Sequence, residues 1–191
     1  MTITKQKVID WVLDFVETIV SSLAIFFIIY IFIVQPHQVN GHSMDPNLQT
    51  GEFLLTEKVS YRFHQPHRGD VVVFQAPVSS GCIGDDCDYI KRIIGLPGEK
   101  VKVSNGKIFV NDQQLDETSY LSASVITGAG SFTAGEKEII LAENQYFVCG
   151  DNRSASSDSR AWGPIERDSI VGRAFFSYWP IGTFGLIKQG H

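Results

Sequence analysis

The chain has 191 residues, with 16 basic and 21 acidic side chains and a formal net charge of −5 at pH 7. This acidic balance argues against nucleic-acid binding, which normally needs a basic surface, and three cysteines are too few for a disulfide scaffold. The length allows one membrane segment and one globular domain of about 150 residues with a core of its own.

The first predicted element is a membrane anchor over residues 8–35. Residues 19–34 form an uncharged apolar run, and helical periodicity extends it back to residue 8. A helix over residues 8–34 would be about 40 Å long, which is more than the roughly 30 Å of the hydrocarbon layer. Pro36 ends the helix, because proline disfavours α geometry in the residue before it.

A cleaved signal peptide and a buried helix of a soluble protein are the alternatives to this anchor. The run is longer than the apolar region of most signal peptides, and Val-Gln-Pro-His follows it where a small-x-small cleavage site belongs. Charge-free runs this apolar are rare in soluble helices. Lys5 and Lys7 precede the run, and no basic residue follows before Lys58. The positive-inside rule therefore predicts a cytoplasmic tail of residues 1–7 and places the rest of the chain outside.

Beyond the anchor, short runs rich in β-branched and aromatic residues alternate with turn sequences. The predicted strands are residues 53–57, 70–74, 89–94, 100–103, 107–110, 138–141, 146–149 and 170–178. Asn105-Gly106 predicts a hairpin turn. Residues 119–135 are low in charge and rich in small side chains, so we expect a mobile loop or the tip of an insert there.

The predicted fold class is mainly β. One N-terminal transmembrane helix is followed by a largely antiparallel β domain of residues 36–104 and 138–185, with a small β insert at residues 105–137. Within this domain, we expect the apolar residues 175–181 to form a core strand rather than a lipid contact.

Ser43 is the candidate nucleophile, in the stretch Gly41-His-Ser-Met-Asp-Pro-Asn-Leu48. A serine hydroxyl attacks well only when a nearby group takes its proton. His42 is adjacent, but in an extended chain neighbouring side chains point to opposite faces, so His42 is badly placed. Lys91 is the better candidate for that role.

Lys91 lies in Tyr89-Ile-Lys-Arg-Ile-Ile94, where strand alternation places it and Arg92 on opposite faces. One of these two cations must therefore point into whatever the strand covers. Arginine keeps its proton, whereas a desolvated lysine loses it, and lowering its pKa to about 8 would take roughly 3 kcal/mol. A neutral Lys91 amine would accept the Ser43 proton. The alternative is a surface lysine whose charge stays in water.

A second polar cluster, Gly150-Asp-Asn-Arg-Ser-Ala-Ser-Ser-Asp-Ser-Arg160, directly follows an apolar strand. It is either a solvated loop or a hydrogen-bonded scaffold, in which a serine orients a lysine amine and Asp–Arg pairs hold the loop's shape. Asn152-Arg-Ser154 also fits the short glycan acceptor pattern.

The cysteines and histidines leave two questions. Cys82 and Cys87 bracket a turn-like stretch and are either bridged or two free thiols, while Cys149 is expected to be buried at a strand end. A metal site built from the histidines and the Cys82/Cys87 pair fits no ordinary zinc spacing. We therefore expect no metal and no cofactor.

Four segments in order resemble the motifs of bacterial type I signal peptidases, peptidase family S26. They are Gly41-His-Ser-Met-Asp-Pro46, Arg68-Gly-Asp-Val-Val-Val-Phe74, Tyr89-Ile-Lys-Arg-Ile-Ile-Gly-Leu-Pro-Gly-Glu99 and the 150–160 cluster. Residues 111–143 match poorly. The single anchor and short insert are similar to the smaller form of the family that is common in Gram-positive bacteria.

The resemblance implies a Ser–Lys dyad, with Ser43 as nucleophile and Lys91 as general base. Ser156 matches the serine that orients the lysine. The matching positions that support the loop or shape the site are Asp158, Arg160, Asp151, Arg153, Met44 and Pro46. Gly41 stands where some members carry a serine that helps to hold the oxyanion, which leaves backbone donors, chiefly the Ser43 N–H.

The implied function is a membrane-bound serine endopeptidase that cleaves signal peptides from exported preproteins at the outer face of the cell membrane. The substrate would lie extended beside a strand edge, with small side chains in shallow pockets. The expected partners are preproteins and the lipid bilayer, with no nucleic acid, and the enzyme is expected to be monomeric. The alternatives are a non-catalytic surface module and a soluble self-cleaving regulator, which would carry a DNA-binding head in place of the anchor.

Overall fold

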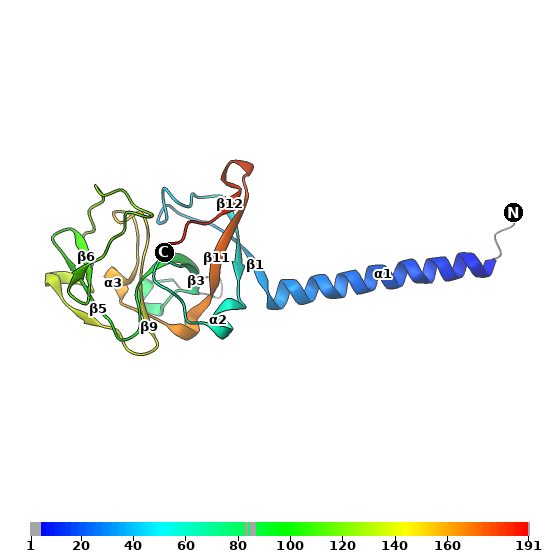
Figure 1. Cartoon of the computed structure of the whole chain (residues 1–191), viewed down its shortest axis with the longest axis horizontal. Helices are drawn as coiled ribbons and strands as arrows, with labels where there is room; N and C mark the ends of the chain where they lie inside the picture. The colour runs from blue at the N-terminus through cyan, green and yellow to red at the C-terminus, as the bar shows by residue number, and fades with distance from the viewer. Residues whose placement is uncertain (1–4, 83, 85–86, 191) are drawn as a thin grey trace.

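A long helix leads into a β domain in this computed structural model, which describes residues 5–82, 84 and 87–190. Helix α1 (Lys5–Phe32) projects away from the domain (Figure 1). Its segment Lys7–Tyr30 has a mean hydropathy of 2.2 and buries none of its surface against the domain, so it is long and apolar enough to cross a membrane. The prediction of one N-terminal apolar helix is confirmed.

The first strand begins two residues after α1 ends, which the sequence did not predict. Strand β1 (Val34–Gln38) runs through Pro36 and, among the described residues, pairs only with β2 (Phe53–Glu57). Proline is tolerated because β1 lies at the sheet edge, where a missing N–H interrupts no second ladder. Helix α1 thus ends at Phe32, before the end of the predicted anchor at residue 35, and the β domain follows directly from the helix.

The main sheet is antiparallel throughout and has the strand order β1-β2-β11-β3-β4-β9-β10, with β12 paired to β11. Its further strands are β3 (Val71–Gln75), β4 (Asp88–Gly95), β9 (Gln145–Cys149), β10 (Ile165–Glu166), β11 (Ile170–Trp179) and β12 (Gly185–Leu186). Short helices connect them: α2 (Ser60–Phe63), α3 (Ser159–Trp162) and 3-10 turns at Val78–Ser80, Ala134–Glu136, Arg167–Ser169 and Ile181–Thr183. The predicted antiparallel β domain is confirmed.

A second sheet has the order β7-β6-β5-β8 and lies at the end of the domain farthest from α1 (Figure 1). Its strands are β5 (Lys100–Ser104), β6 (Lys107–Val110), β7 (Gln113–Gln114) and β8 (Ile139–Ile140). The predicted boundaries assigned β5 and β8 to the main domain, but β5 pairs only with β6 and β8. We therefore propose that the insert spans residues 100–140.

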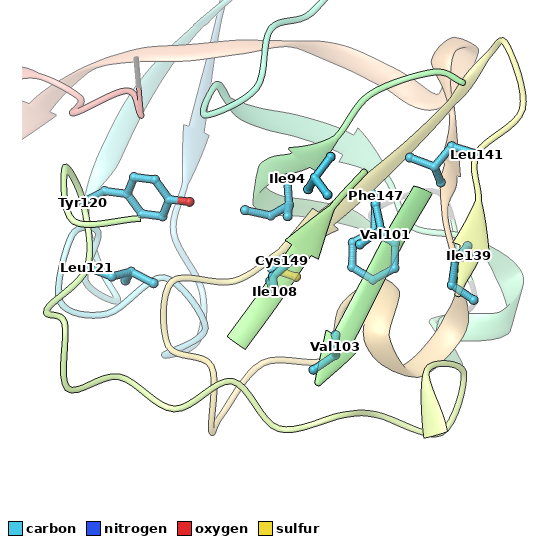
Figure 2. Close-up of a cluster of buried hydrophobic side chains, with 11 residues drawn as sticks. Ile94, Val101, Val103, Ile108, Tyr120, Leu121, Ile139, Leu141, Phe147 and Cys149 are labelled. Carbon is cyan, nitrogen blue, oxygen red and sulfur yellow. The ribbon is translucent and has the colours of Figure 1, made fainter. Parts of the chain in front are cut away.

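The two sheets share one buried apolar cluster (Figure 2). Gly95 permits their close approach, because a Cβ there would lie 2.5 Å from Val101 and 2.8 Å from Leu141. Cys149 is fully buried in this cluster, as predicted. Tyr120 and Leu121 belong to it too, so of the two alternatives for residues 119–135, a mobile loop or the tip of an insert, apolar burial favours the second at the start of this segment.

Cys82 and Cys87 are joined by a disulfide, which resolves the alternative left by the sequence, and Cys149 is a free thiol. In denaturant without reductant, we expect an alkylating reagent to label one cysteine of the three; after reduction it should label all three. Mass spectrometry of the full-length protein counts the labels. Three labels before reduction would contradict the bridge.

Candidate active site

Ser43 lies on a turn that follows β1 and is held in place by buried side chains of the same turn. Met44 and Leu48 are 1% and 2% exposed and pack into a core cluster with Leu54. The Leu48 N–H donates to the Met44 carbonyl, which closes the turn. The buried side chains fix the backbone of the turn, while Ser43 itself stays half-buried at the surface.

Lys91 meets Ser43 directly. Its Nζ donates a hydrogen bond to Ser43 Oγ at 2.7 Å and another to the Ile90 carbonyl at 3.0 Å. Lys91 is 5% exposed, on a stretch of β4 that pairs with the central strand β3. Burial lowers the pKa of Lys91 to about 8, although the nearby Asp158, Cys149 and Asp151 act in the opposite direction. The geometry therefore pairs a hydroxyl with an amine that gives up its proton easily.

Arg92 points away from Ser43, as the strand alternation predicts, and it is also fully buried. Its Nε and Nη2 donate to the two carboxylate oxygens of Asp151 at 2.8 and 2.7 Å. The guanidinium also lies 4.2 Å from the centre of the Tyr120 ring. At this point one face of β4 carries Lys91, which contacts Ser43, and the opposite face carries the Arg92–Asp151 ion pair.

The 150–160 loop is a hydrogen-bonded scaffold rather than a solvated loop. Asp158 is fully buried, accepts two hydrogen bonds from the Arg160 guanidinium at 2.8 Å each, and accepts the Gly150 N–H at 3.0 Å. The two other charged residues of the loop pair outside it, since Asp151 binds Arg92 while Arg153 binds Glu117 of the insert. The loop is therefore fastened to β4 and to the insert as well as to itself.

Ser156 lies beside the dyad, but the structure shows no hydrogen bond from it to Lys91. A Cβ on Gly150 would lie 2.3 Å from Ser156 Oγ and 2.3 Å from the Ser43 carbonyl oxygen, so Ser156 and Ser43 approach each other across Gly150. Ser156 Oγ is buried and has no hydrogen-bond partner among the described residues. Its predicted role in orienting the lysine stays a prediction.

Two asparagines fasten the turn to the loop, a role that the sequence did not predict for either of them. Asn152 donates from its backbone to the Ser43 carbonyl at 3.0 Å and from its side chain to the His42 carbonyl at 2.9 Å. Asn47 donates to Asp151 at 2.8 Å and to the Tyr120 carbonyl at 2.9 Å. More than 70 residues separate the members of each pair, so no local pattern announces them.

The backbone around Ser43 offers a site for an oxyanion. The Ser43 N–H makes no hydrogen bond within the described part of the chain, so it is free to donate. Gly41 has a φ of +102°, a conformation that L side chains rarely adopt, and its carbonyl accepts a hydrogen bond from Thr50 at 2.6 Å. A serine in this position would strain the turn as it stands.

A groove of about 300 Å³ runs beside the dyad between residues 38–44 and residues 88–91. Ser43 and Lys91 both line it, as does Asp88, whose carboxylate lies 3.5 Å from His37 Nε2. Strand β9 pairs with β4 only from Arg92 onwards, which leaves one edge of residues 88–91 without a neighbouring strand. An extended peptide fits such a free edge. Within the described residues, no cluster of side chains could hold a metal ion.

The chain is similar to known proteins, and the matching family model spans all of the site residues described above. The family model described as signal peptidase, peptidase S26, matches residues 12–179. The probable signal peptidase I-2 of Synechocystis sp. is 37% identical, covering 93% of this chain and 78% of that protein. Signal peptidase IB of Staphylococcus aureus strain COL is 35% identical, covering 94% of each chain. A crystal structure of a signal peptidase I from Enterococcus faecalis is 28% identical, covering 58% of this chain and 97% of that chain, with a TM-score of 0.44.

Proposed function

Because the chain belongs to the type I signal peptidases of peptidase family S26, enzymes that cleave signal peptides from preproteins, we propose that Ser43 is its nucleophile and Lys91 its general base. The observation that carries this proposal is the 2.7 Å contact between Lys91 Nζ and Ser43 Oγ, made by a lysine that is 5% exposed. Incubation of the wild type and of Ser43→Ala with a preprotein in detergent tests it.

The mechanism follows from the two side chains. With a pKa of about 8, roughly a tenth of Lys91 is neutral at pH 7, enough for the amine to take the Ser43 proton. Ser43 Oγ attacks the scissile carbonyl carbon, and the Ser43 N–H stabilises the oxyanion. The Lys91 ammonium then returns the proton to the leaving amine, so that the C–N bond breaks and an acyl-enzyme remains. A water molecule that Lys91 deprotonates hydrolyses this ester.

The shape of the groove fits an extended peptide substrate with small side chains. An extended signal-peptide segment would bond through its backbone to the free edge of residues 88–91, opposite residues 38–41. The groove's volume of about 300 Å³ is at the small end for a binding site, which suits small side chains. Met44 and Ile90 in its walls limit the size of the residue next to the scissile bond.

Membrane attachment is supported by two exposed apolar surfaces. The side chains of α1 from Val8 to Tyr30 are exposed along the helix, which fits an environment of lipid. A second surface lies at the β11–β12 tip, where Trp179, Ile181, Phe184 and Leu186 are 52%, 78%, 65% and 81% exposed. The prediction of a core strand over residues 175–181 is thus wrong at its end, and lipid contact of this tip explains the exposure.

The arrangement we propose is a monomer with a single membrane pass and no nucleic-acid partner. The N-terminus is cytoplasmic and the catalytic domain is outside, because the basic residues Lys5 and Lys7 precede the apolar run. An extracytoplasmic location also agrees with the bridge between Cys82 and Cys87, since disulfides persist in oxidising compartments.

Activity is expected to rise with pH between about pH 6 and pH 9, with a midpoint near 8. Only the deprotonated Lys91 accepts the serine proton, and burial lowers its pKa to about 8, so the active fraction grows as pH increases through that value. The kcat/KM for a peptide substrate in detergent measures this. A profile that is flat from pH 7 to pH 9 would contradict a lysine base with this pKa.

A further inference from the structure

A larger cavity of about 600 Å³ lies next to the catalytic turn, the turn that follows β1 and carries Ser43, on the side facing the insert. Three segments form its walls: Asp45 and Pro46 of the turn, residues 120–126 of the insert, and residues 151–154 of the polar loop. The substrate groove is built from the adjoining parts of the same turn and loop, namely residues 41–44 with Ala155 and Ser157. The cavity and the groove are therefore neighbours along two segments at once.

Ser43 and Lys91 line the groove, and Asp45 and Pro46 of the cavity wall follow Ser43 closely in the chain. A peptide bound in the groove therefore has its scissile bond beside the Ser43–Lys91 contact. Asn152, in the wall of the larger cavity, donates to the Ser43 carbonyl at 3.0 Å. A peptide that leaves the groove beyond Ser43 enters this cavity within the next few residues, at about 3.3–3.6 Å per residue.

The direction of this path agrees with the fold. The second sheet, whose insert supplies one wall of the cavity, lies at the end of the domain farthest from α1 (Figure 1). A preprotein whose signal peptide starts at the membrane must continue away from the membrane after its cleavage site. The cavity lies on that route.

The insert wall is held in place before any substrate arrives. Lys107 Nζ donates to the carbonyls of Ala123 and Val125 at 3.1 and 3.2 Å, and the Thr127 N–H donates to the Gly106 carbonyl at 2.8 Å. Between these fixed points Ile126 is 74% exposed and lines the cavity. A Cβ on Gly106 would lie 2.9 Å from Ile126 Cγ2, so this side chain rests on the hairpin turn.

The charges in the walls restrict which side chain fits. Two of the charged wall residues are neutralised by ion-pair partners, Asp151 by Arg92 and Arg153 by Glu117. The remaining charge in the wall is that of Asp45, whose partner is the exposed His42 at 3.0 Å. The remaining wall is apolar or uncharged, with Pro46, Val125 and Ile126 among the apolar residues. An apolar side chain is therefore accepted, and an acidic one is repelled by Asp45.

We propose that this cavity is a specificity site for the first residues of the mature protein, those directly after the cleavage site, and that it prefers an apolar over an acidic side chain there. The proposal rests on the proposed function, since it uses Ser43 as the cleavage point. Ile126 is its main specificity-determining side chain. Ile126 belongs to the insert, so we assign this preference to the insert.

Two peptide substrates test it, with the same signal-peptide part. One continues for six residues after the scissile bond with leucines nearest the bond, and the other ends one residue after it. We expect Ile126→Asp to lower the ratio of kcat/KM for the long over the short substrate about tenfold, and Ile126→Leu to restore it. Ile140→Asp is the matched control, because Ile140 is 67% exposed on β8 of the second sheet and lies outside the cavity.

The outcomes separate this proposal from the dyad. An unchanged ratio in Ile126→Asp, or an equal fall in Ile140→Asp, overturns the specificity site, whatever happens to Ser43. Cleavage of the short substrate by Ser43→Ala overturns the dyad instead. An aspartate in place of the leucines should lower kcat/KM for the wild type, and a preference for that aspartate would also defeat the proposal.

Discussion

Ser43→Ala is expected to lower kcat/KM for a preprotein by roughly 10⁴-fold or more, because it removes the oxygen that forms the acyl-enzyme. Lys91→Arg should be nearly as damaging. Arginine fills a similar space but keeps its proton, so it cannot accept the one from Ser43 at 2.7 Å. Release of the mature protein in detergent, followed over time by gel electrophoresis, measures both variants.

Matched controls separate chemistry from folding in this experiment. Ser131→Ala removes an exposed hydroxyl of the insert, and Lys102→Arg changes a partly exposed lysine of the second sheet. Both should stay within about twofold of the wild type, as surface changes usually do. Retained turnover in Ser43→Ala or in Lys91→Arg would show that the reaction uses another nucleophile or another base.

Much of the sheet could be predicted because its strands are long and chemically uniform. The runs that became β2, β4 and β11 are rich in β-branched and aromatic residues, and each was predicted to within a residue at either end. Strand β1 was missed because Pro36 argues against a strand and only its edge position permits one. Strands β7, β10 and β12 have two residues each, too few for any periodicity to show.

The dyad could be predicted because it depends on residue chemistry and on strand alternation. Lysine is the cation that burial can neutralise, and alternation separates Lys91 from Arg92. The partners within the scaffold could not be predicted in the same way. Asp151 pairs with a residue 59 positions away and Arg153 with one 36 positions away, and only the folded chain brings them together. The sequence indicated Asp–Arg pairs within the loop; Asp158–Arg160 is such a pair, whereas Asp151 and Arg153 have partners elsewhere.

The insert shows the same limit. Its small, weakly charged residues suggested a mobile loop or the tip of an insert, and did not predict that Tyr120 is 7% exposed and lies under the Arg92 guanidinium. A strand that is distant in the sequence buries Tyr120. A single tyrosine among polar residues shows no hydrophobic periodicity, so the local sequence does not predict this burial. The insert thus contacts the residue next to the proposed base, and it forms a wall beside the turn of the proposed nucleophile.

Asp151→Ala is expected to lower the free energy of unfolding by about 3–5 kcal/mol, because it leaves the fully buried Arg92 charge without its carboxylate. Chemical denaturation of the full-length protein in detergent, followed by near-UV circular dichroism, measures the loss. The double variant Arg92→Ala/Asp151→Ala should lose less than the sum of the two single changes. Lys100→Ala breaks an exposed pair with Glu138 and should cost at most about 1 kcal/mol.

The same ion pair also tests which side of β4 carries the chemistry. Arg92 supports the site through Asp151, which in turn accepts a hydrogen bond from Asn47 of the catalytic turn, but it touches neither Ser43 nor the groove. At a temperature where both variants remain folded, Arg92→Ala should therefore keep more activity than Lys91→Ala. Fold is checked by circular dichroism and activity by cleavage of a model preprotein. If the order were reversed, the assignment of Lys91 to the catalytic face of β4 would be wrong, since removing the general base should cost roughly 10²–10⁴-fold in rate.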